Sequence, residues 1–403
     1  MVSLPKKIEQ ERERRFHKRD VSELDREECR DIDYKAAGAL VDGRVLLGPS
    51  QTAARALDWK HLKFQHEDAE NGTISCVALC PNGKLFGAAW DDITVMVWRL
   101  EDGLTVQNLG DQGHTDTIWS IAFSPDSKHL VSGSADAAAI VWDIKTGDVV
   151  HRLEGHTEDI MAVAYSPDGS LIATGSSDYY LMIWDAFSGE QLHIFKEFGA
   201  DVRRVAFSPD GSRLAACSDV SVTVWDPHAG TRVATLLGHN SAIWCMAFSP
   251  DGERIMTGSE DSSARVWNAS SGEALVVLHE HTSSVWSAAF SPDGSEVATA
   301  SYDGTVVTCD SWTGQRRFVF SDDVDAVVEA VAYSLKNDLI ASGAADGRVR
   351  VWNAKSGAFV AEFQGHEEMV KNVMFTPDGC NLLSHADDGS IRYWSILDTL
   401  RLS

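Results

Sequence analysis

The chain has 403 residues, of which 44% are hydrophobic and 24% charged, values that are typical of globular proteins with a sizeable core. No apolar run approaches the ~18 residues that a membrane span requires, and the charged N-terminus shows no secretory signal, so we expect no membrane association. Residues 1–60 hold 13 of the 35 Lys and Arg and 12 of the 60 Asp and Glu, which leaves a net charge of −26 for residues 61–403. So acidic a surface predicts no direct nucleic-acid binding by this region, and it favours partner proteins with basic segments.

The first 55 residues form a charged N-terminal extension. Residues 5–33 are dense in charge and contain few apolar side chains, so we expect this segment to be partly helical or disordered. Residues 36–56 are typical of a linker with room for one short strand. The basic run at residues 14–19 resembles a nuclear-import signal only weakly, because acidic residues flank it.

Seven cysteines are present, and no pair has the C-x-x-C spacing of a zinc site. Their odd number and irregular spacing favour neither a disulfide framework nor a metal centre. We therefore expect no cofactor and a reducing compartment, the cytoplasm or the nucleus.

From about residue 66 one unit recurs, most clearly at residues 113–143, 155–185 and 238–268. Each unit contains short β-branched and aromatic runs separated by Ser-Pro-Asp-Gly or related turns, which predicts four strands in roughly 42 residues. A tryptophan ends the third predicted strand in seven units, and a cysteine stands there in the eighth: Trp98, Trp142, Trp184, Trp225, Trp267, Cys309, Trp352 and Trp394.

The Gly-His pair that opens a unit and the Trp-Asp pair that ends its third strand resemble the WD-repeat family. The resemblance covers residues 66–394, more than four-fifths of the chain. It implies an all-β fold, in which residues 56–403 form a β-propeller of four-stranded antiparallel blades, similar to WD-repeat scaffold and corepressor-type proteins.

Eight units predict eight blades; a seven-bladed ring with one degenerate unit outside it is the alternative. Only nine residues follow Trp394, too few for a turn and a full outer strand. Residues 56–66 align with the outer-strand segment of the other units, so we expect residues near 57–65 to complete the last blade and close the ring.

The resemblance also assigns a structural role to a repeated His, Ser or Thr, Asp and Trp grouping, which in the family forms a buried hydrogen-bonded chain within a blade. Four units keep the whole set: His114, Ser132, Asp136 and Trp142; His156, Thr174, Asp178 and Trp184; His239, Thr257, Asp261 and Trp267; and His366, Ser384, Asp388 and Trp394. A hydrolase needs one activated nucleophile rather than copies around a ring, and no phosphate loop or nucleophile elbow is present. We therefore predict no catalytic residues and no enzymatic activity.

The other four units depart from this set. In the fourth unit, Phe198 stands at the His position and Ala215 at the Ser/Thr position. Ala88 stands at the Ser/Thr position of the first unit, Cys309 at the Trp position of the sixth, and Val324 at the His position of the seventh. We expect softer blades there, unless apolar packing replaces the lost hydrogen bonds.

Partner binding is predicted at the top mouth of the channel, from two positions that face it in the family. The first position lies six residues before the proline of the Ser-Pro turn, and in units one to eight it holds Ser75, Trp119, Met161, Arg203, Trp244, Trp286, Glu329 and Lys371. The second position directly precedes the structural Asp, and it holds Asp91, Ala135, Ser177, Ser218, Glu260, Tyr302, Ala345 and Asp387. Three tryptophans bordered by carboxylates suit a peptide whose Lys or Arg lies over an indole face, although the same rings would also suit packing between blades.

These patterns predict a non-enzymatic scaffold that binds partner proteins on the top face, with a chromatin or transcriptional corepressor complex as one setting. The alternative is a structural subunit of an RNA-processing or ribosome-assembly complex.

Overall fold

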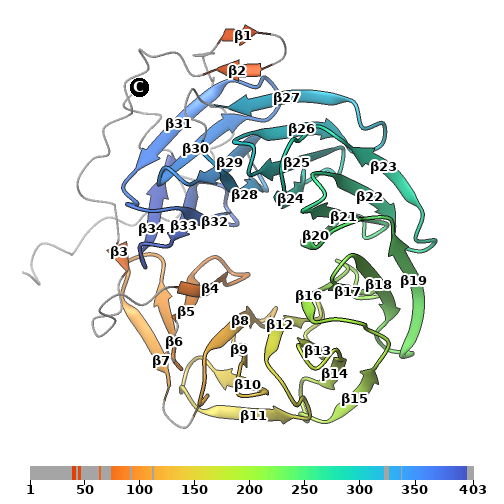
Figure 1. Cartoon of the computed structure of the whole chain (residues 1–403). Coiled ribbons are helices and arrows are strands. Elements are labelled where there is room, and N and C mark those ends of the chain that lie inside the picture. Colours follow the sequence, from red (N-terminus) through yellow and green to blue (C-terminus); the bar gives the residue numbers. More distant parts are fainter. Residues whose placement is uncertain are drawn as a thin grey trace, which may run out of the picture. The chain divides into compact units, whose positions relative to one another are not determined.

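The computed structural model describes residues 39–41, 44–46, 63–64, 74–90, 93–110, 113–321, 326–336 and 338–396. All of them belong to one unit, Tyr34–Ser403, and all the elements described in it are strands, which form eight sheets. Figure 1 shows these sheets arranged as a ring, with one edge strand of each sheet nearest the centre. The prediction of an all-β propeller with eight four-stranded antiparallel blades is confirmed.

The first four blades follow one another along the chain. Blade one contains β4 (Ile74–Leu79), β5 (Leu85–Trp90), β6 (Val95–Arg99) and β7 (Thr105–Leu109). Blade two contains β8 (Ile118–Phe123), β9 (His129–Ser134), β10 (Ala138–Asp143) and β11 (Val149–Glu154). Blade three contains β12 (Ile160–Tyr165), β13 (Leu171–Ser176), β14 (Leu181–Asp185) and β15 (Gln191–Phe195). Blade four contains β16 (Val202–Phe207), β17 (Leu214–Ser218), β18 (Ser221–Asp226) and β19 (Thr231–Leu237).

The other four blades continue the ring, and two of them also recruit strands from near the N-terminus. Blade five contains β20 (Ile243–Phe248), β21 (Arg254–Ser259), β22 (Ala264–Asn268) and β23 (Ala274–Leu278). Blade six contains β24 (Val285–Phe290), β25 (Glu296–Ser301), β26 (Val306–Asp310) and β27 (Arg316–Ser321), and β1 (Ala39–Val41) and β2 (Arg44–Leu46) extend it. Blade seven contains β28 (Val328–Tyr333), β29 (Leu339–Ala344), β30 (Arg348–Asn353) and β31 (Phe359–Gln364). Blade eight contains β32 (Val370–Phe375), β33 (Asn381–Ala386), β34 (Ile391–Ser395) and β3 (Lys63–Phe64).

The ring closes as the sequence predicts. Strand β3 pairs antiparallel with β34, with Lys63 opposite Arg392 and Phe64 opposite Ile391. Side chains of blades eight and one share an apolar cluster in which Leu383 and Ile391 accompany Phe86. The end of the last blade is therefore covered by a strand that precedes the first blade, which removes an exposed sheet edge.

Residues 39–46 differ from the expected linker with one short strand. They form two strands, since β1 pairs with β2 and β2 pairs in parallel with β27, the outer strand of blade six. Strand β2 thus covers the edge of β27, which makes blade six a six-stranded sheet.

The blades approach each other closely because small residues stand on their second strands. A Cβ added at Gly175 would lie 2.6 Å from Val202 Cγ1, and one added at Gly343 would lie 2.5 Å from Val370 Cγ1. Both valines begin the first strand of the next blade. Glycine at this place lets the sheets pack face to face, as protein interiors require.

The closure can be tested by truncation. A chain of residues 56–403 retains β3, whereas a chain of residues 74–403 leaves the edge of β34 bare. We expect the shorter chain to melt several degrees lower and to self-associate, because an unpaired strand edge is open to pairing. Differential scanning calorimetry and size-exclusion chromatography of the two chains measure this, and equal melting temperatures would contradict the role of β3.

Candidate functional site

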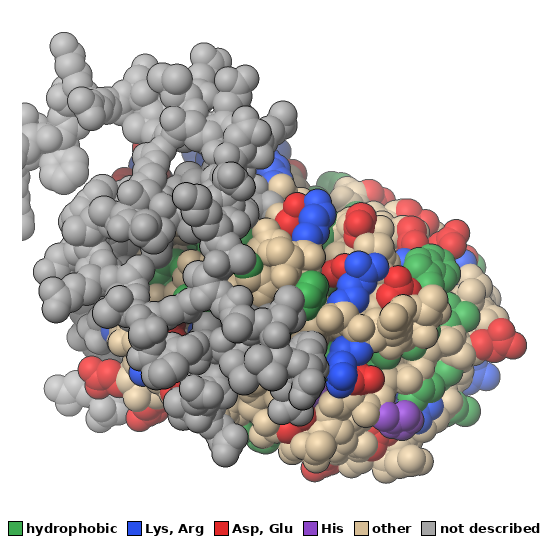
Figure 2. Space-filling view, turned by 90° about the horizontal axis from the view of Figure 1, so that it is seen from above, with side chains coloured by type: hydrophobic (Ala, Val, Ile, Leu, Met, Phe, Trp, Pro, Cys, Tyr) green, Lys and Arg blue, Asp and Glu red, His purple; other side chains and the backbone are tan. Residues whose placement is uncertain are grey.

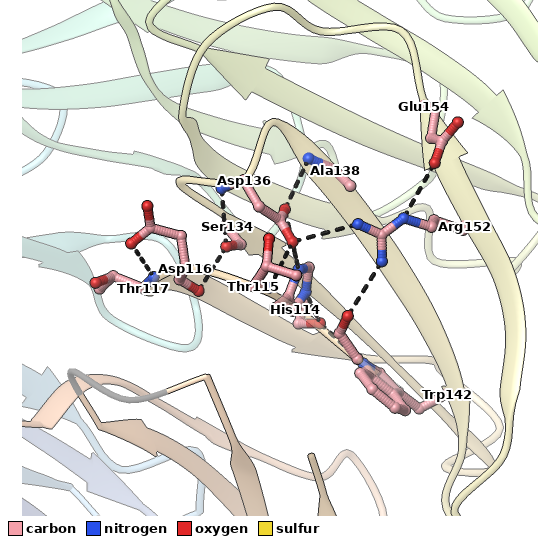
Figure 3. A network of polar contacts seen from close by, with 12 residues as sticks. His114, Thr115, Asp116, Thr117, Ser134, Asp136, Ala138, Trp142, Arg152 and Glu154 are labelled. Carbon is pink, nitrogen blue, oxygen red and sulfur yellow. Dashed lines mark hydrogen bonds and ion pairs between the residues drawn. The ribbon is translucent and has the colours of Figure 1, made fainter. Parts of the chain in front are cut away.

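The polar network of blade two joins the segment before its first strand to its second and third strands (Figure 3). His114 Nε2 lies 2.7 Å from Ser132 Oγ, and Trp142 Nε1 donates to the same hydroxyl oxygen at 2.8 Å. His114 Nδ1 lies 3.0 Å from Asp136 Oδ2, which also accepts the backbone N–H of Thr115 at 3.0 Å. Burial opposes ionisation of Asp136, but the hydrogen bonds from His114 and Thr115 outweigh it and hold the pKa of this carboxyl below its usual range.

The complete network recurs in blades three, five and eight. His156 Nε2 and Thr174 Oγ1 lie 2.8 Å apart, and Trp184 donates to the same hydroxyl at 2.9 Å. The equivalent His···hydroxyl and Trp→hydroxyl distances are 2.7 and 2.8 Å in blade five and 2.8 and 2.7 Å in blade eight. The hydroxyl is buried and already holds both partners, so the grouping braces the blade and offers no accessible nucleophile.

Blades four and six compensate for their missing network residues in different ways. In blade four, Trp225 donates to Thr223 Oγ1 at 3.0 Å, and the rings of Phe195 and Phe198 pack against it with centroids 4.1 and 6.4 Å away. Blade six lacks the tryptophan but keeps the histidine contact, with His281 Nε2 2.7 Å from Thr299 Oγ1, and the Thr299 hydroxyl lies 3.3 Å from the carbonyl oxygen of Val307. In blade four a different hydroxyl thus accepts the indole N–H, and apolar packing takes the place of the histidine.

Blade seven uses an ionic network in place of the histidine. Asp346 accepts a hydrogen bond from Arg350 at 2.5 Å, and Glu362 accepts one from Arg348 at 3.1 Å and forms an ion pair with Arg350 at 3.2 Å. Trp352 Nε1 is buried without a partner in the described part of the chain. Val324, which stands at the histidine position, lies outside the described residues.

We predict that Asp178→Ala lowers stability. Asp178 accepts the backbone N–H groups of Thr157 and Tyr180 and lies 2.8 Å from His156 Nδ1. Loss of the carboxylate leaves the buried His156 without this partner and removes two backbone hydrogen bonds, at a cost of roughly 1–3 kcal/mol.

The matched control for this variant is Asp219→Asn in blade four. Asp219 lies in the corresponding but shorter turn of blade four and is exposed, and Phe198 stands at the histidine position of that blade. Asparagine tolerates the φ of 50° at this position. Thermal melting should show a lower melting temperature for Asp178→Ala and Asp178→Asn and an unchanged one for the control. An unchanged melting temperature for Asp178→Ala would mean that the network does not stabilise the blade.

Blade eight contains a second buried histidine, His385, which is not part of the His–Ser–Asp–Trp network. His385 is 7% exposed, and its Nδ1 has no hydrogen-bond partner in the described part of the chain. It occupies the place held by glycine in blades two, three, five and seven and by alanine in blade six. Burial, with repulsion from His366 and Lys371, lowers the pKa of His385 to about 4.

Acid should therefore destabilise the ring. The unfolded chain takes up a proton at His385 near pH 6.5 and the folded chain only near pH 4, so stability falls as the pH drops through this window. Between about pH 7.5 and about pH 5 this residue alone accounts for roughly 2 kcal/mol. Burial also lowers the pKa of His156 and of His239, which adds to the same trend.

Urea unfolding at the two pH values measures this dependence. His385→Ala places at this position the residue that blade six already has, and we expect the variant to lose clearly less stability on acidification than the wild type. An equal loss in both proteins would show that His385 does not titrate as proposed.

The predicted top-face positions of blades five to eight lie together. The rings of Trp244 and Trp286 stack with centroids 4.4 Å apart, and Trp286 stacks on Tyr302 at 4.8 Å. The chain of contacts continues from Tyr302, whose hydroxyl donates to Glu329 Oε1 at 2.5 Å.

An ionic group extends this chain into blade eight. Lys371 Nζ lies 3.0 Å from a carboxylate oxygen of Glu329 and 3.3 Å from one of Asp387. We call these residues the top-face cluster: Trp244, Trp286, Tyr302, Glu329, Lys371 and Asp387.

The buried charge of the top-face cluster is compensated by groups of the cluster itself. Glu329 is only 8% exposed, and both Lys371 and the Tyr302 hydroxyl compensate it. Burial opposes the charge of Lys371, but its bonds to Glu329 and Asp387 outweigh this and raise the pKa of the ammonium group. Burial and the hydrogen bond to Glu329 raise the pKa of Tyr302, so its hydroxyl remains a donor. The half-exposed carboxylate of Asp387 is the part of this ionic group most accessible to a partner.

The stacked rings present only part of their faces to a partner. Trp286 is covered on both faces, so a partner cation has access only to the outer faces of Trp244 and Tyr302. The Nε1 atoms of Trp244 and Trp286 are buried and have no acceptor in the described part of the chain. In this arrangement of the side chains these N–H groups are not accessible to a partner.

The other predicted top-face residues do not join the cluster. Trp119 is 39% exposed and donates to Asp159 at 3.2 Å. Arg203 pairs with Asp201, and Glu260 accepts the Ser241 hydroxyl. Met161 and Ser75 are half-buried, and Asp91 lies outside the described residues.

The sequence reasoning missed Arg204 and Asp159. Arg204 Nε donates to the carbonyl oxygen of Trp244 at 2.6 Å, so blade four contacts the end of the aromatic stack. Asp159 holds the indole of Trp119. Arg204 directly follows a predicted top-face position, and this adjacency was the one available signal.

The described residues contain no group of three potential metal ligands and no helix long and apolar enough to cross a membrane. Cys217, Cys245 and Cys309 are free and buried, and burial raises the pKa of each thiol to about 12. Such thiols are poor ligands and poor nucleophiles.

Comparison with known proteins identifies the family. The family model "WD domain, G-beta repeat" matches residues 105–143, 147–185, 189–226, 230–268, 272–309, 314–353 and 357–395, well over half of the chain. The chain belongs to the WD40-repeat family. WD40 propellers are generally non-catalytic and bind other proteins.

Similar proteins cover only parts of this chain. WD repeat-containing protein 1 of Bos taurus is 30% identical over 110 residues, 27% of this chain and 18% of that protein. Periodic tryptophan protein 2 of Arabidopsis thaliana is 40% identical over 67 residues, 17% of this chain and 7% of that protein. Pre-rRNA-processing protein IPI3 of Mycosarcoma maydis is 34% identical over 73 residues, 18% of this chain and 12% of that protein.

A solved structure covers more of the fold. The crystal structure of the computationally designed Ika8 protein matches with a TM-score of 0.71 and 27% identity, over 81% of this chain and 98% of the designed one.

Proposed function

We propose that this WD40 protein is a scaffold that binds partner proteins at the top-face cluster, and that it recognises an extended segment carrying Lys or Arg. The observation that carries the proposal is the continuous cluster from Trp244 to Asp387, which crosses four blades. Aromatic rings and charged groups that several elements position together are typical of interaction hot spots.

The chemistry of the cluster supports an extended basic segment. Asp387 and the exposed Glu260 can accept its basic side chains. The acidic balance of residues 61–403 steers such a segment toward the ring.

The finer setting of this scaffold is also a proposal. A chromatin or corepressor complex fits a reader of basic segments in the nucleus or the cytoplasm. Similarity to proteins named for pre-rRNA processing and periodic tryptophan repeats supports the alternative of a structural subunit in a ribosome-assembly or RNA-processing complex. Quantitative affinity purification from cells distinguishes the two by whether corepressor subunits or ribosome-assembly factors are enriched.

We predict that Trp244→Ala and Trp286→Ala each weaken binding of the main partner roughly thirtyfold, the usual effect of truncating a hot-spot tryptophan. Trp244→Phe and Trp286→Phe keep an aromatic ring but reduce its size, so we expect them to weaken binding less than the alanine variants, by several-fold, through loss of contact area. Isothermal titration of the purified partner segment measures both effects.

The control for this experiment is Trp119→Ala, which removes a top-face tryptophan outside the cluster and should change affinity little. Circular dichroism melting must show that each variant is folded. Normal binding by folded Trp244→Ala and Trp286→Ala proteins would refute the proposal, and loss of binding only together with unfolding would show that the rings are packing residues.

A further inference from the structure

Strand β23 presents an unusual outer edge on blade five. Among the outer strands β7, β11, β15, β19, β23, β27 and β31, β23 alone consists of apolar residues only. Val276 and Leu278 are buried against blade six, whereas Leu275 and Val277 on the opposite face are 41% and 40% exposed. Natural proteins usually protect an edge strand with charges or a cover, because its free N–H and C=O groups can pair with another strand.

The surface around this edge is mixed in charge. Figure 2 looks onto the side of the ring that includes blades five to seven and shows hydrophobic side chains among acidic and basic ones toward its right-hand part. The exposed residues Glu273 and His279 flank β23 directly. The apolar edge is therefore bracketed by an acid at one end and an imidazole at the other.

The neighbouring blade shows that an outer edge of this ring can accept another strand. Strand β27 of blade six pairs with β2, which places Val45 opposite Phe320. Strand β23 has no such cover within the described part of the chain, since blade five has four strands and β23 is the last of them.

The exposed face of β23 is complementary to itself. Side chains two residues apart share a face of a strand, so Glu273, Leu275, Val277 and His279 lie along one face. Antiparallel pairing with an identical strand about Val276 would place Leu275 opposite Val277 of the second copy and Glu273 opposite its His279. Each apolar residue then meets an apolar one, and each acid meets an imidazole donor.

We propose that two copies of the chain associate through β23, which pairs antiparallel with β23 of the second copy about a two-fold axis at Val276. The pairing joins two blades into one eight-stranded sheet, satisfies both strand edges and buries both apolar pairs. Because the interface is isologous, it closes at a dimer and leaves the top-face cluster of each copy free.

Strand β15 carries a similar pattern on its exposed face, with Glu190, Leu192, Ile194 and Lys196. Two of its side chains are engaged within the copy: Lys196 lies 4.9 Å from the ring centroid of Tyr180, and His193 Nε2, in the middle of the strand, lies 3.3 Å from the carbonyl oxygen of His228. Its five residues also include two polar ones. These differences favour β23, and the experiment separates the two edges.

Sedimentation velocity and light scattering of the full chain at physiological ionic strength test the proposal. The wild type should show a mass near twice 44.0 kDa that dissociates on dilution. Val277→Lys and the double variant Leu275→Lys/Val277→Lys should weaken association at least tenfold, because they oppose an ammonium group to an apolar residue or to a second lysine. The matched control is Val150→Lys on β11, a residue 41% exposed, which should leave the dimer intact.

A charge exchange tests the register. Glu273→Lys alone places a lysine opposite His279 of the second copy, and His279→Glu alone places two acids opposite each other, so each change should weaken the dimer. The two changes together place a lysine opposite a glutamate and should restore it. A wild type that remains a monomer, a dimer that survives Leu275→Lys/Val277→Lys, or a dimer lost in Leu192→Lys but kept in Val277→Lys would each overturn the proposal. Equal melting temperatures of the variants show that association, rather than folding, has changed.

Discussion

The structure depends on one constraint: a blade can bury its two apolar faces only against the blades beside it. The core clusters show this directly, since Val95 and Leu109 of blade one pack with Ile118 and Trp142 of blade two in a single cluster. No blade has a core of its own, so the sheets must continue until the last one meets the first. Blades eight and one are not consecutive in the chain. Residues 63–64, which pair with β34, and the apolar cluster that the two blades share close the ring at this junction.

Face-to-face packing also explains where polar groups are tolerated inside the ring. A buried tryptophan on the third strand brings an indole N–H with it, and that N–H needs an acceptor. In blade two the Ser132 hydroxyl supplies the acceptor, and His114 and Asp136 orient that hydroxyl and tie the entering loop to the sheet. In blade four the Thr223 hydroxyl supplies the acceptor instead, whereas in blade seven Trp352 Nε1 has no acceptor in the described part of the chain and an arginine–carboxylate group braces the sheet.

The repeat made much of this predictable from sequence alone. The spacing of the tryptophans indicated eight blades, and the position of residues 56–66 indicated the closing strand, because both follow from a regular period. The network in four blades followed from residue identity at fixed positions. The pairing of β2 with β27 could not be predicted, because it is a contact outside the period and residues 44–46 carry no repeat pattern.

The top face was predictable only as a set of positions. Sequence placed Trp119, Trp244 and Trp286 at equivalent places, but it could not show that two of them stack while the third bonds to Asp159. That difference depends on which neighbour each ring meets across the gap between blades. The expected ring of acid was likewise altered, because Lys371 lies between Glu329 and Asp387 and neutralises part of it.

Because equivalent positions of the repeat are free to differ, one ring can carry chemically distinct surfaces. Contacts within the top-face cluster run between blades, so each of them also fixes the spacing of neighbouring sheets: Tyr302 of blade six holds Glu329 of blade seven, which holds Lys371 of blade eight. A partner bound there meets groups that the ring has already positioned, which lowers the entropy lost on binding. The edge of β23 faces outward from the ring instead, so pairing of two copies there would present two top faces at once, and two linked sites retain a partner with two binding segments longer than one site does.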